Sequence, residues 1–265
     1  MVAAIPWWVA AFFCLPCRAR GGGVAVPTPE DSRRNGMSYL LASFGQALDL
    51  ILSFEQDLLR IVWSSVYVAT WGILFASLVG IPLGMAVGLG RFPGRRLVIT
   101  LLNTLMALPT VVVGLVLFGL FSRQGPLGFL GILFTPTAII AGLAVLAAPI
   151  VTNYVVATVT AADARIIPTA MTLGATPVQA RIVLFREVRF GLVAAIVAGF
   201  GRVISEVGVA MMLGGNIRGS TRTMTTAIAL ETSKGEFVFG LALGIVLLSV
   251  ALLINLGLNY FQHRD

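Results

Sequence analysis

Residues 168–188 read PTAMTLGATPVQARIVLFREV and interrupt a chain that is otherwise mostly apolar. Gly174 predicts the end of one short helix, because glycine adopts a positive φ without strain. Thr176 and Pro177 predict the start of a second helix, as its N-cap and its first residue. This helix is expected to run through VQARIVLFREV into the apolar segment that follows. A plain connection needs about 2–8 residues, whereas this one takes up residues 163–189. A polar connection that holds two helices indicates a docking surface for a soluble partner.

The composition of the 265-residue chain is that of a membrane protein. Hydrophobic residues make up 58% and charged residues 11% of the chain, and the mean hydropathy is +0.97. Soluble domains carry about 25% charged residues, so this much apolar surface requires lipid as its solvent. The net charge of +7 comes almost entirely from arginine, as is typical of membrane proteins with basic cytoplasmic loops. No stretch is both soluble and basic, which argues against nucleic-acid binding.

Candidates for metal or redox chemistry are few. Cys14 and Cys17 form a single CxxC without a second pair, and His263 is the only histidine. One isolated CxxC is weak support for a metal or redox site, and we expect two incidental apolar residues. No bound cofactor or metal is expected on this chain.

Five membrane spans are predicted, and the fold class is an all-α polytopic membrane protein. The run 124–162 is uncharged but too long for one helix. Its Gly- and Pro-rich first part predicts a loop with a short helix, or a re-entrant segment. A sixth span there would require two crossings within a short length. Since a span needs about 20 apolar residues, the spans are placed at residues 61–88, 98–121, 137–160, 190–213 and 238–259.

Loop charges predict the orientation of the chain in the membrane. The segment before the first span carries Asp49, Glu55 and Asp57 and suits the outside. Five spans then place the N-terminus outside and the tail, residues 261–265, in the cytoplasm. The connections after the first and third spans are assigned to the cytoplasm by their arginines: Arg91, Arg95 and Arg96 in one, and Arg165, Arg181, Arg186 and Arg189 in the other.

The N-terminal part of the chain differs in character from the rest. Residues 1–36 end in GGGVAVPTPEDSRRNG, which is typical of a disordered linker, and we expect a disordered or mis-started extension, with the natural start at Met37. Residues 37–59 are predicted to form an amphipathic interfacial helix, with partner binding as the alternative, and residues 60–260 to form the membrane domain. One face of that helix would carry Leu40, Leu41, Phe44, Leu48, Ile51 and Leu52.

The sequence TAMTLGA, followed by IVL, resembles the coupling-helix motif of type I ABC importer permeases. Ala170 and Gly174 match the second alanine and the glycine of that motif, whereas Pro168 and Thr169 replace its Glu-Ala opening. The closing Leu-Pro of the family motif is absent. The resemblance implies that an ATPase subunit contacts this element. It assigns ATPase coupling to Ala170, Leu173, Gly174, Ala175, Thr176, Pro177 and Arg181.

Three further stretches sharpen the resemblance, which covers roughly residues 57–260. Residues 107–128 resemble the oxyanion branch of these permeases, residues 199–237 are most similar to the tungstate type, and residues 80–89 are similar to importers in general. The resemblance implies a homodimer in a bacterial or archaeal cytoplasmic membrane. It also implies a cytoplasmic ATPase that uses ATP and Mg, and an external substrate-binding protein. The chain has no GxxxxGK[ST] motif, so it is not expected to hydrolyse ATP or to act as an enzyme.

Polar residues in and after the fourth span are the candidates for the translocation pathway. Arg202 and Glu206 stand four apart, so they can pair on one helix face. Each charge costs about 2.5–3.5 kcal/mol at mid-bilayer, which favours a permeation or gating role; a structural ion pair is the alternative. The stretch GGNIRGSTRTMTTAI offers donors for an oxyanion, with a flexible loop against the binding protein as the alternative. Its candidates are Asn216, Arg218, Thr221 and Arg222.

Small residues and prolines predict how the spans pack. Ala195 and Gly199 stand at four-residue spacing, which predicts a close helix contact, either within the chain or at a dimer interface. Pro82, Pro109 and Pro149 lie in or near spans and predict kinks.

Rival functions have less support in the sequence. A gradient-driven secondary transporter calls for inverted repeats and intramembrane carboxylates, and only Glu206 is available. A membrane-embedded enzyme calls for His, Asp or Cys clusters, and the predicted spans contain none. If the chain belongs to an importer, molybdate or another oxyanion is the alternative to tungstate as the transported substrate.

Overall fold

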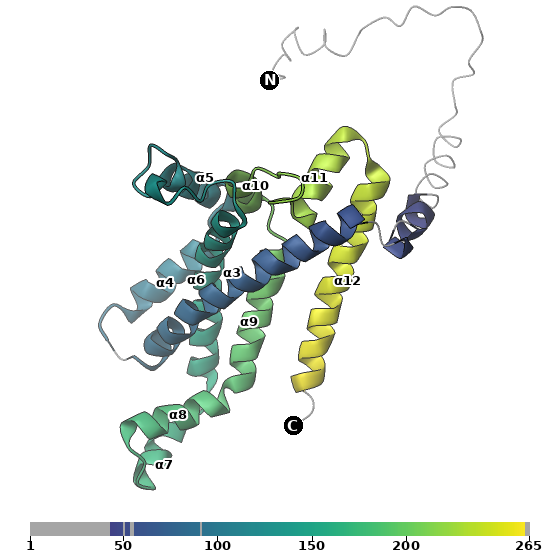
Figure 1. Cartoon of the computed structure of the whole chain (residues 1–265). Coiled ribbons are helices and arrows are strands. Elements are labelled where there is room, and N and C mark those ends of the chain that lie inside the picture. Colours follow the sequence, from purple (N-terminus) through teal and green to yellow (C-terminus); the bar gives the residue numbers. More distant parts are fainter. Residues whose placement is uncertain (1–42, 50, 54–55, 91, 263–265) are drawn as a thin grey trace, which may run out of the picture. The chain divides into compact units, whose positions relative to one another are not determined.

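A computed structural model describes residues 43–262 except residues 50, 54–55 and 91, and the regular structure of this part is helical. The predicted extension, residues 1–36, lies outside the described residues. In chain order the elements are α3 (Gln56–Leu89), α4 (Arg95–Met106), α5 (Thr110–Phe121), η1 (Gly128–Leu130), α6 (Pro136–Ala161), α7 (Ile166–Thr172), α8 (Pro177–Glu187), α9 (Arg189–Ile204), α10 (Gly208–Gly214), α11 (Met224–Lys234) and α12 (Phe237–Gln262) (Figure 1).

Within the described residues, three helices are long and apolar enough to cross a membrane, and the number rises to five if each of two bent pairs forms one span. The long helices are α3, α6 and α12. The pairs are α4 with α5 and α9 with α10. These five segments coincide with the five predicted spans, and the long uncharged run 124–162 divides into a loop with the short helix η1 followed by α6. The prediction of a loop with a short helix is therefore confirmed.

The second and fourth spans are bent: the kink that Pro109 predicts in the second span is confirmed, whereas the break in the fourth span was not predicted. The axes of α4 and α5 differ by 94°. Pro109 is the N-cap of α5, with φ −62° and ψ 122°, and proline also disfavours the helical conformation of the residue before it. The axes of α9 and α10 differ by 61°. There, the Glu206 side chain accepts a hydrogen bond from the N–H of Val209 at 3.3 Å, so the start of α10 is capped from within the break.

The two ends of the helical bundle differ in the elements that they carry. The turn from α3 to α4, the α7–α8 pair and the C-terminal end of α12 lie toward the lower end of Figure 1. The elements α5, α10 and α11 lie toward the upper end. The arginine-rich connections predicted to share one side of the membrane are thus at one end of the molecule.

The helix pair α3–α6 forms the centre of the core. Glycines of α3 at positions 72, 80, 84 and 88 face α6. A Cβ atom at any of them would lie 2.6–3.1 Å from a side-chain atom of α6. Such small residues let helix backbones approach closely within a membrane. The stripe on α3 was not predicted, although its four-residue spacing is visible in the sequence.

Replacement of Gly84 by alanine is expected to destabilise the protein. The new Cβ would lie 2.6 Å from the Cβ of Val155 and 2.8 Å from the backbone oxygen of Thr152, so the two helices would have to separate. Overpacking of this kind costs about 1–3 kcal/mol. Thermal unfolding in detergent should show a lower midpoint. The control is Gly119→Ala in α5, where no atom lies within 4 Å of the added Cβ; equal midpoints for the two variants would contradict the packing argument.

The small residues of the fourth span pack inside the chain. Ala195 is 1% exposed. A Cβ on Gly199 would lie 2.6 Å from Cδ1 of Ile73 and 3.1 Å from Cγ2 of Val151. Of the two alternatives for these residues, the structure shows the contact within the chain.

The segment before α3 is helical over residues 43–49 and 51–52. Ala47 is fully buried in the main core, whereas Phe44, Leu48 and Leu52 are exposed by 45–71%. An exposed apolar face on a helix next to a span is typical of an interfacial helix, which stays a prediction here.

Candidate functional site

The turn between α7 and α8 has the conformation that the sequence predicts. Gly174 has φ 89°, the left-handed conformation that favours glycine. Its N–H donates to the carbonyl of Met171 at 3.1 Å, and the N–H of Ala175 donates to the carbonyl of Ala170 at 3.0 Å. These two bonds form a Schellman motif, which ends α7 and satisfies two of its last carbonyls.

The start of α8 is fixed by a capping box. The Thr176 hydroxyl accepts a hydrogen bond from the N–H of Gln179 at 3.4 Å, and the Gln179 side chain accepts one from the N–H of Thr176 at 2.8 Å. Pro177 is the first helical residue. Both boundary predictions are confirmed, because a Gly stop and a Thr-Pro start are local signals. One prediction is wrong: α8 does not run into the fourth span but ends at Glu187, and α9 begins at Arg189.

The α7–α8 pair presents exposed apolar side chains. No residue of α7 is buried, whereas Ala180 and Leu184 fix α8 to the rest of the chain with exposures of 0% and 3%. Leu173, at the tip, is 84% exposed, and Arg181 is also exposed. Further exposed apolar side chains on the pair are Met171, Val178, Ile182, Val183 and Phe185. The structure thus brings all seven residues assigned to ATPase coupling into one turn and its flanks.

An exposed ion pair precedes α7. Asp163 accepts hydrogen bonds from the side chain and the backbone N–H of Arg165, with a contact of 2.9 Å to Nη2. The side-chain bond and then the backbone bond lower the pKa of Asp163 below its usual value. The pair lies at the surface, with the side chains of Arg165 and Asp163 86% and 49% exposed, so it organises the entry to α7 rather than stabilising the core.

The break between α9 and α10 holds the predicted Arg202–Glu206 ion pair. Nη1 of Arg202 donates to Oε2 of Glu206 at 2.7 Å. The Glu206 side chain is 3% exposed, whereas that of Arg202 is 43% exposed. Glu206 lies beyond the end of α9, in the break itself. The buried carboxylate therefore holds one edge of a guanidinium group that otherwise lies at the surface of the chain.

Two hydroxyl groups extend this cluster to other helices. Oγ1 of Thr225 donates to the backbone carbonyl of Glu206 at 2.8 Å. Ser65 of α3 accepts a hydrogen bond from the N–H of Met224, the first residue of α11, at 2.6 Å. Ser65 and Thr225 were not predicted, because hydroxyl groups are common in apolar spans and do not by themselves indicate a site.

The loop after α10 uses two of its four predicted donors for its own structure. Asn216, at φ 52°, donates to the carbonyl of Thr226 at 3.2 Å. Thr221 is fully buried; it donates to the carbonyl of Gly214 and accepts from the N–H of Ile217 at 3.0 Å. These side chains hold the loop in shape. Their proposed part in translocation stays a prediction.

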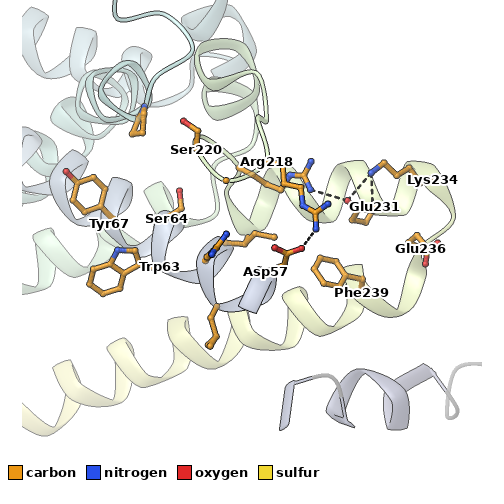
Figure 2. Close-up of a pocket in the computed structure, with 16 residues that line it drawn as sticks. Asp57, Trp63, Ser64, Tyr67, Arg218, Ser220, Glu231, Lys234, Glu236 and Phe239 are labelled. Carbon is orange, nitrogen blue, oxygen red and sulfur yellow. Dashed lines mark hydrogen bonds and ion pairs between the residues drawn. The ribbon is translucent and has the colours of Figure 1, made fainter. Parts of the chain in front are cut away.

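Arg218 and Arg222 line a cavity of about 1130 Å³ at this end of the molecule. The cavity is formed by the first turns of α3, the loop after α10, α11 and the start of α12 (Figure 2). Its lining does not include Arg202 or Glu206, so the predicted pathway residues fall into two separate places. Most of the charged residues that line this cavity were not predicted from the sequence. Besides Arg218 and Arg222, the charged lining residues are Asp57, Arg60, Glu231, Lys234 and Glu236.

A metal site finds no support in the described part of the chain, where no three His, Cys, Asp or Glu side chains are grouped so as to hold an ion.

Similarity to known proteins identifies the family of this chain. Residues 80–264 match the family described as "Binding-protein-dependent transport system inner membrane component". The chain belongs to this family. The range that matches this inner membrane component includes the α7–α8 turn, the Arg202–Glu206 pair and the loop after α10.

Individual members of the family are similar to this chain over most of their length. The chain is 39% identical over 219 residues to the tungstate uptake system permease protein TupB of Peptoclostridium acidaminophilum, which covers 83% of this chain and 96% of that protein. It is 39% identical over 212 residues to a probable anion ABC transporter permease protein of Haloferax volcanii. That match covers 78% of this chain and 90% of that protein. A chain in the crystal structure of a bacterial alginate ABC transporter, in complex with an alginate pentasaccharide-bound periplasmic protein, matches with a TM-score of 0.69. That match has 19% identity and covers 87% of this chain and 88% of that chain, so it shows the type I importer permease fold.

Proposed function

We propose that this chain is the membrane-spanning permease subunit of an ATP-driven importer for an oxyanion, with tungstate as its substrate. The observation that carries the proposal is the likeness to a tungstate uptake permease over 96% of that protein's length. Molybdate is a dianion of the same tetrahedral shape, so a delivering binding protein would set the choice between the two.

The α7–α8 pair would bind the ATPase subunit on the cytoplasmic side. Leu173 and its apolar neighbours are exposed on a surface that has no partner within the described chain, and an apolar surface of this kind is typical of a protein interface. The chain itself lacks a phosphate-binding loop. ATP and Mg would therefore belong to the ATPase, and this chain would carry out no chemistry and bind no cofactor.

The orientation follows from the arrangement of charges. The arginine-rich connections lie at the α7–α8 end of the molecule (Figure 1), which we assign to the cytoplasm by the excess of basic residues. The C-terminal end of α12 would then be cytoplasmic, and the cavity beside α11 would face the outside, where a substrate-binding protein would deliver the anion.

Two copies of the chain would enclose the pathway. Arg202 is 43% exposed and stands 13 residues after Arg189, the first residue of α9, so it lies about 20 Å along that helix. A charge at that depth in a bilayer about 30 Å thick costs too much against lipid. The Arg202 face would instead meet a wet pathway beside a second copy, and ATP-driven closure of the ATPase would shift the equilibrium between inward and outward states.

The proposal is tested by purifying the chain from its own host in mild detergent. An ABC ATPase should co-purify in equal amount. Leu173→Asp should remove the ATPase, because it places a charge in the middle of the contact. Phe129→Asp is the matched control, since Phe129 is 81% exposed in η1 at the other end of the molecule. An ATPase that co-purifies equally with both variants would show that α7–α8 is not its binding site.

A further inference from the structure

The cavity beside α11 combines a large volume with charged groups from distant parts of the chain. Figure 2 shows Asp57 of α3 next to Arg218 of the loop after α10, and Glu231 next to Lys234 on α11. Pockets of about 300–1,000 Å³ with a few converging polar groups are the usual binding sites of proteins, and this cavity of about 1130 Å³ has that character. Its charges decide which ligand it suits.

One wall of the cavity carries an ion cluster with an excess of one positive charge. Glu231 is 11% exposed and contacts two cations, Arg222 at 3.6 Å and Lys234 at 3.2 Å. Arg222 is 14% exposed, and its Nε is buried without a hydrogen-bond partner among the described residues. A buried donor of this kind calls for an acceptor. The part of the Arg222 guanidinium group that lines the cavity suits an oxygen of a tetrahedral anion.

The α3 side of the cavity adds a second cation, Arg60. Arg218 is paired with Asp57, so that pair is neutral. Arg60 lines the same cavity, and within the described residues it takes part in no salt bridge. Arg60 and the Arg222 cluster together leave two positive charges, and Glu236 is the remaining carboxylate of the lining. With Glu236 counted, the lining carries four cations and three carboxylates, a net charge of +1, which favours an anion over a cation.

We propose that this cavity is an outward-facing acceptor site for a tetrahedral dianion, in which Arg60 and Arg222 bind the anion and Glu231 positions Arg222. The inference rests on the proposed function, since it assigns a place where the released tungstate would first contact the permease. Asp57 and Glu231 remain as competing partners of the nearby cations, so the anion is bound weakly enough to move on. A site of pure positive charge would hold a dianion too long.

The test is direct binding of tungstate to the purified permease–ATPase complex without binding protein. Equilibrium dialysis, with bound tungsten counted by mass spectrometry, should give one tungstate for each permease chain. Arg60→Ala and Arg222→Ala should each weaken binding at least tenfold, whereas Arg222→Lys should keep part of it. Arg60 is exposed, so its loss does not threaten folding. The control is Arg123→Ala, which removes an exposed arginine outside the cavity and should leave binding unchanged.

Two results would overturn the inference: unchanged tungstate affinity in Arg60→Ala and Arg222→Ala, or a cavity filled by a co-purified phospholipid that tungstate does not displace. Uptake assays separate this inference from the proposed function. A complex that imports tungstate but binds none in the cavity refutes only the acceptor site. A complete complex that does not import tungstate at all refutes the proposed function.

Discussion

Replacement of Arg202 by alanine is expected to abolish tungstate uptake while the permease–ATPase complex still assembles. The exposed edge of Arg202 is the only charge at this depth on α9, and a cation in a low-dielectric wall attracts a passing dianion strongly. Uptake into proteoliposomes should fall to background. ATP hydrolysis stimulated by the binding protein should persist, since α7–α8 is untouched.

Stability and transport should separate in the double variant. Arg202→Ala alone leaves Glu206, which is 3% exposed, without its cation, and an unpaired buried group costs about 1–3 kcal/mol. Arg202→Ala/Glu206→Ala should regain stability in thermal unfolding but not regain uptake. Arg123→Ala serves as the control for loss of one arginine. Normal uptake by the double variant would mean that the pair is only structural.

Replacement of Gly174 by valine is expected to uncouple the transporter from its ATPase. At φ 89°, a residue with a side chain costs about 1–2 kcal/mol or more, and most for a β-branched one. Because α7 buries no residue, its direction depends on the Schellman turn, and the strain is relieved by reorientation of α7. Since 1.4 kcal/mol corresponds to a tenfold change, uptake and co-purified ATPase should fall at least about tenfold.

Gly94→Val provides the matched control for this strain. Gly94 has φ 94° and no atom within 4 Å of an added Cβ, and it lies before α4 rather than in the α7–α8 turn. Gly94→Val should lower the midpoint of thermal unfolding about as much as Gly174→Val does, while most tungstate uptake is retained. Equal loss of uptake in both variants would attribute the effect to general destabilisation rather than to the turn.

Local signals account for what could be predicted from the sequence. The five spans follow from runs of apolar residues, and the ends of α7 and α8 follow from Gly174 and from Thr176 with Pro177. The pairing of Arg202 with Glu206 follows from their four-residue spacing. Each of these depends on residues close together in the chain, where helix geometry leaves few choices.

The features that sequence reasoning missed depend on distant contacts. Asp57 meets Arg218 across 161 residues, so no spacing rule connects them, and the cavity they share could not be assembled from the sequence. The break at residues 205–207 was missed because Glu206 replaces helical hydrogen bonds with a side-chain cap. Asn216 and Thr221 were chosen as anion donors by residue type, and the structure shows the Asn216 amide nitrogen and the Thr221 hydroxyl donating to backbone carbonyls.

The most direct test of the account is tungstate uptake into proteoliposomes that contain the permease and its ATPase, with the binding protein outside and ATP inside. Uptake should require all three proteins and ATP hydrolysis, and it should be lost in Arg202→Ala. Uptake by this chain alone, driven by an ion gradient without ATP, would contradict the importer function and favour a secondary transporter.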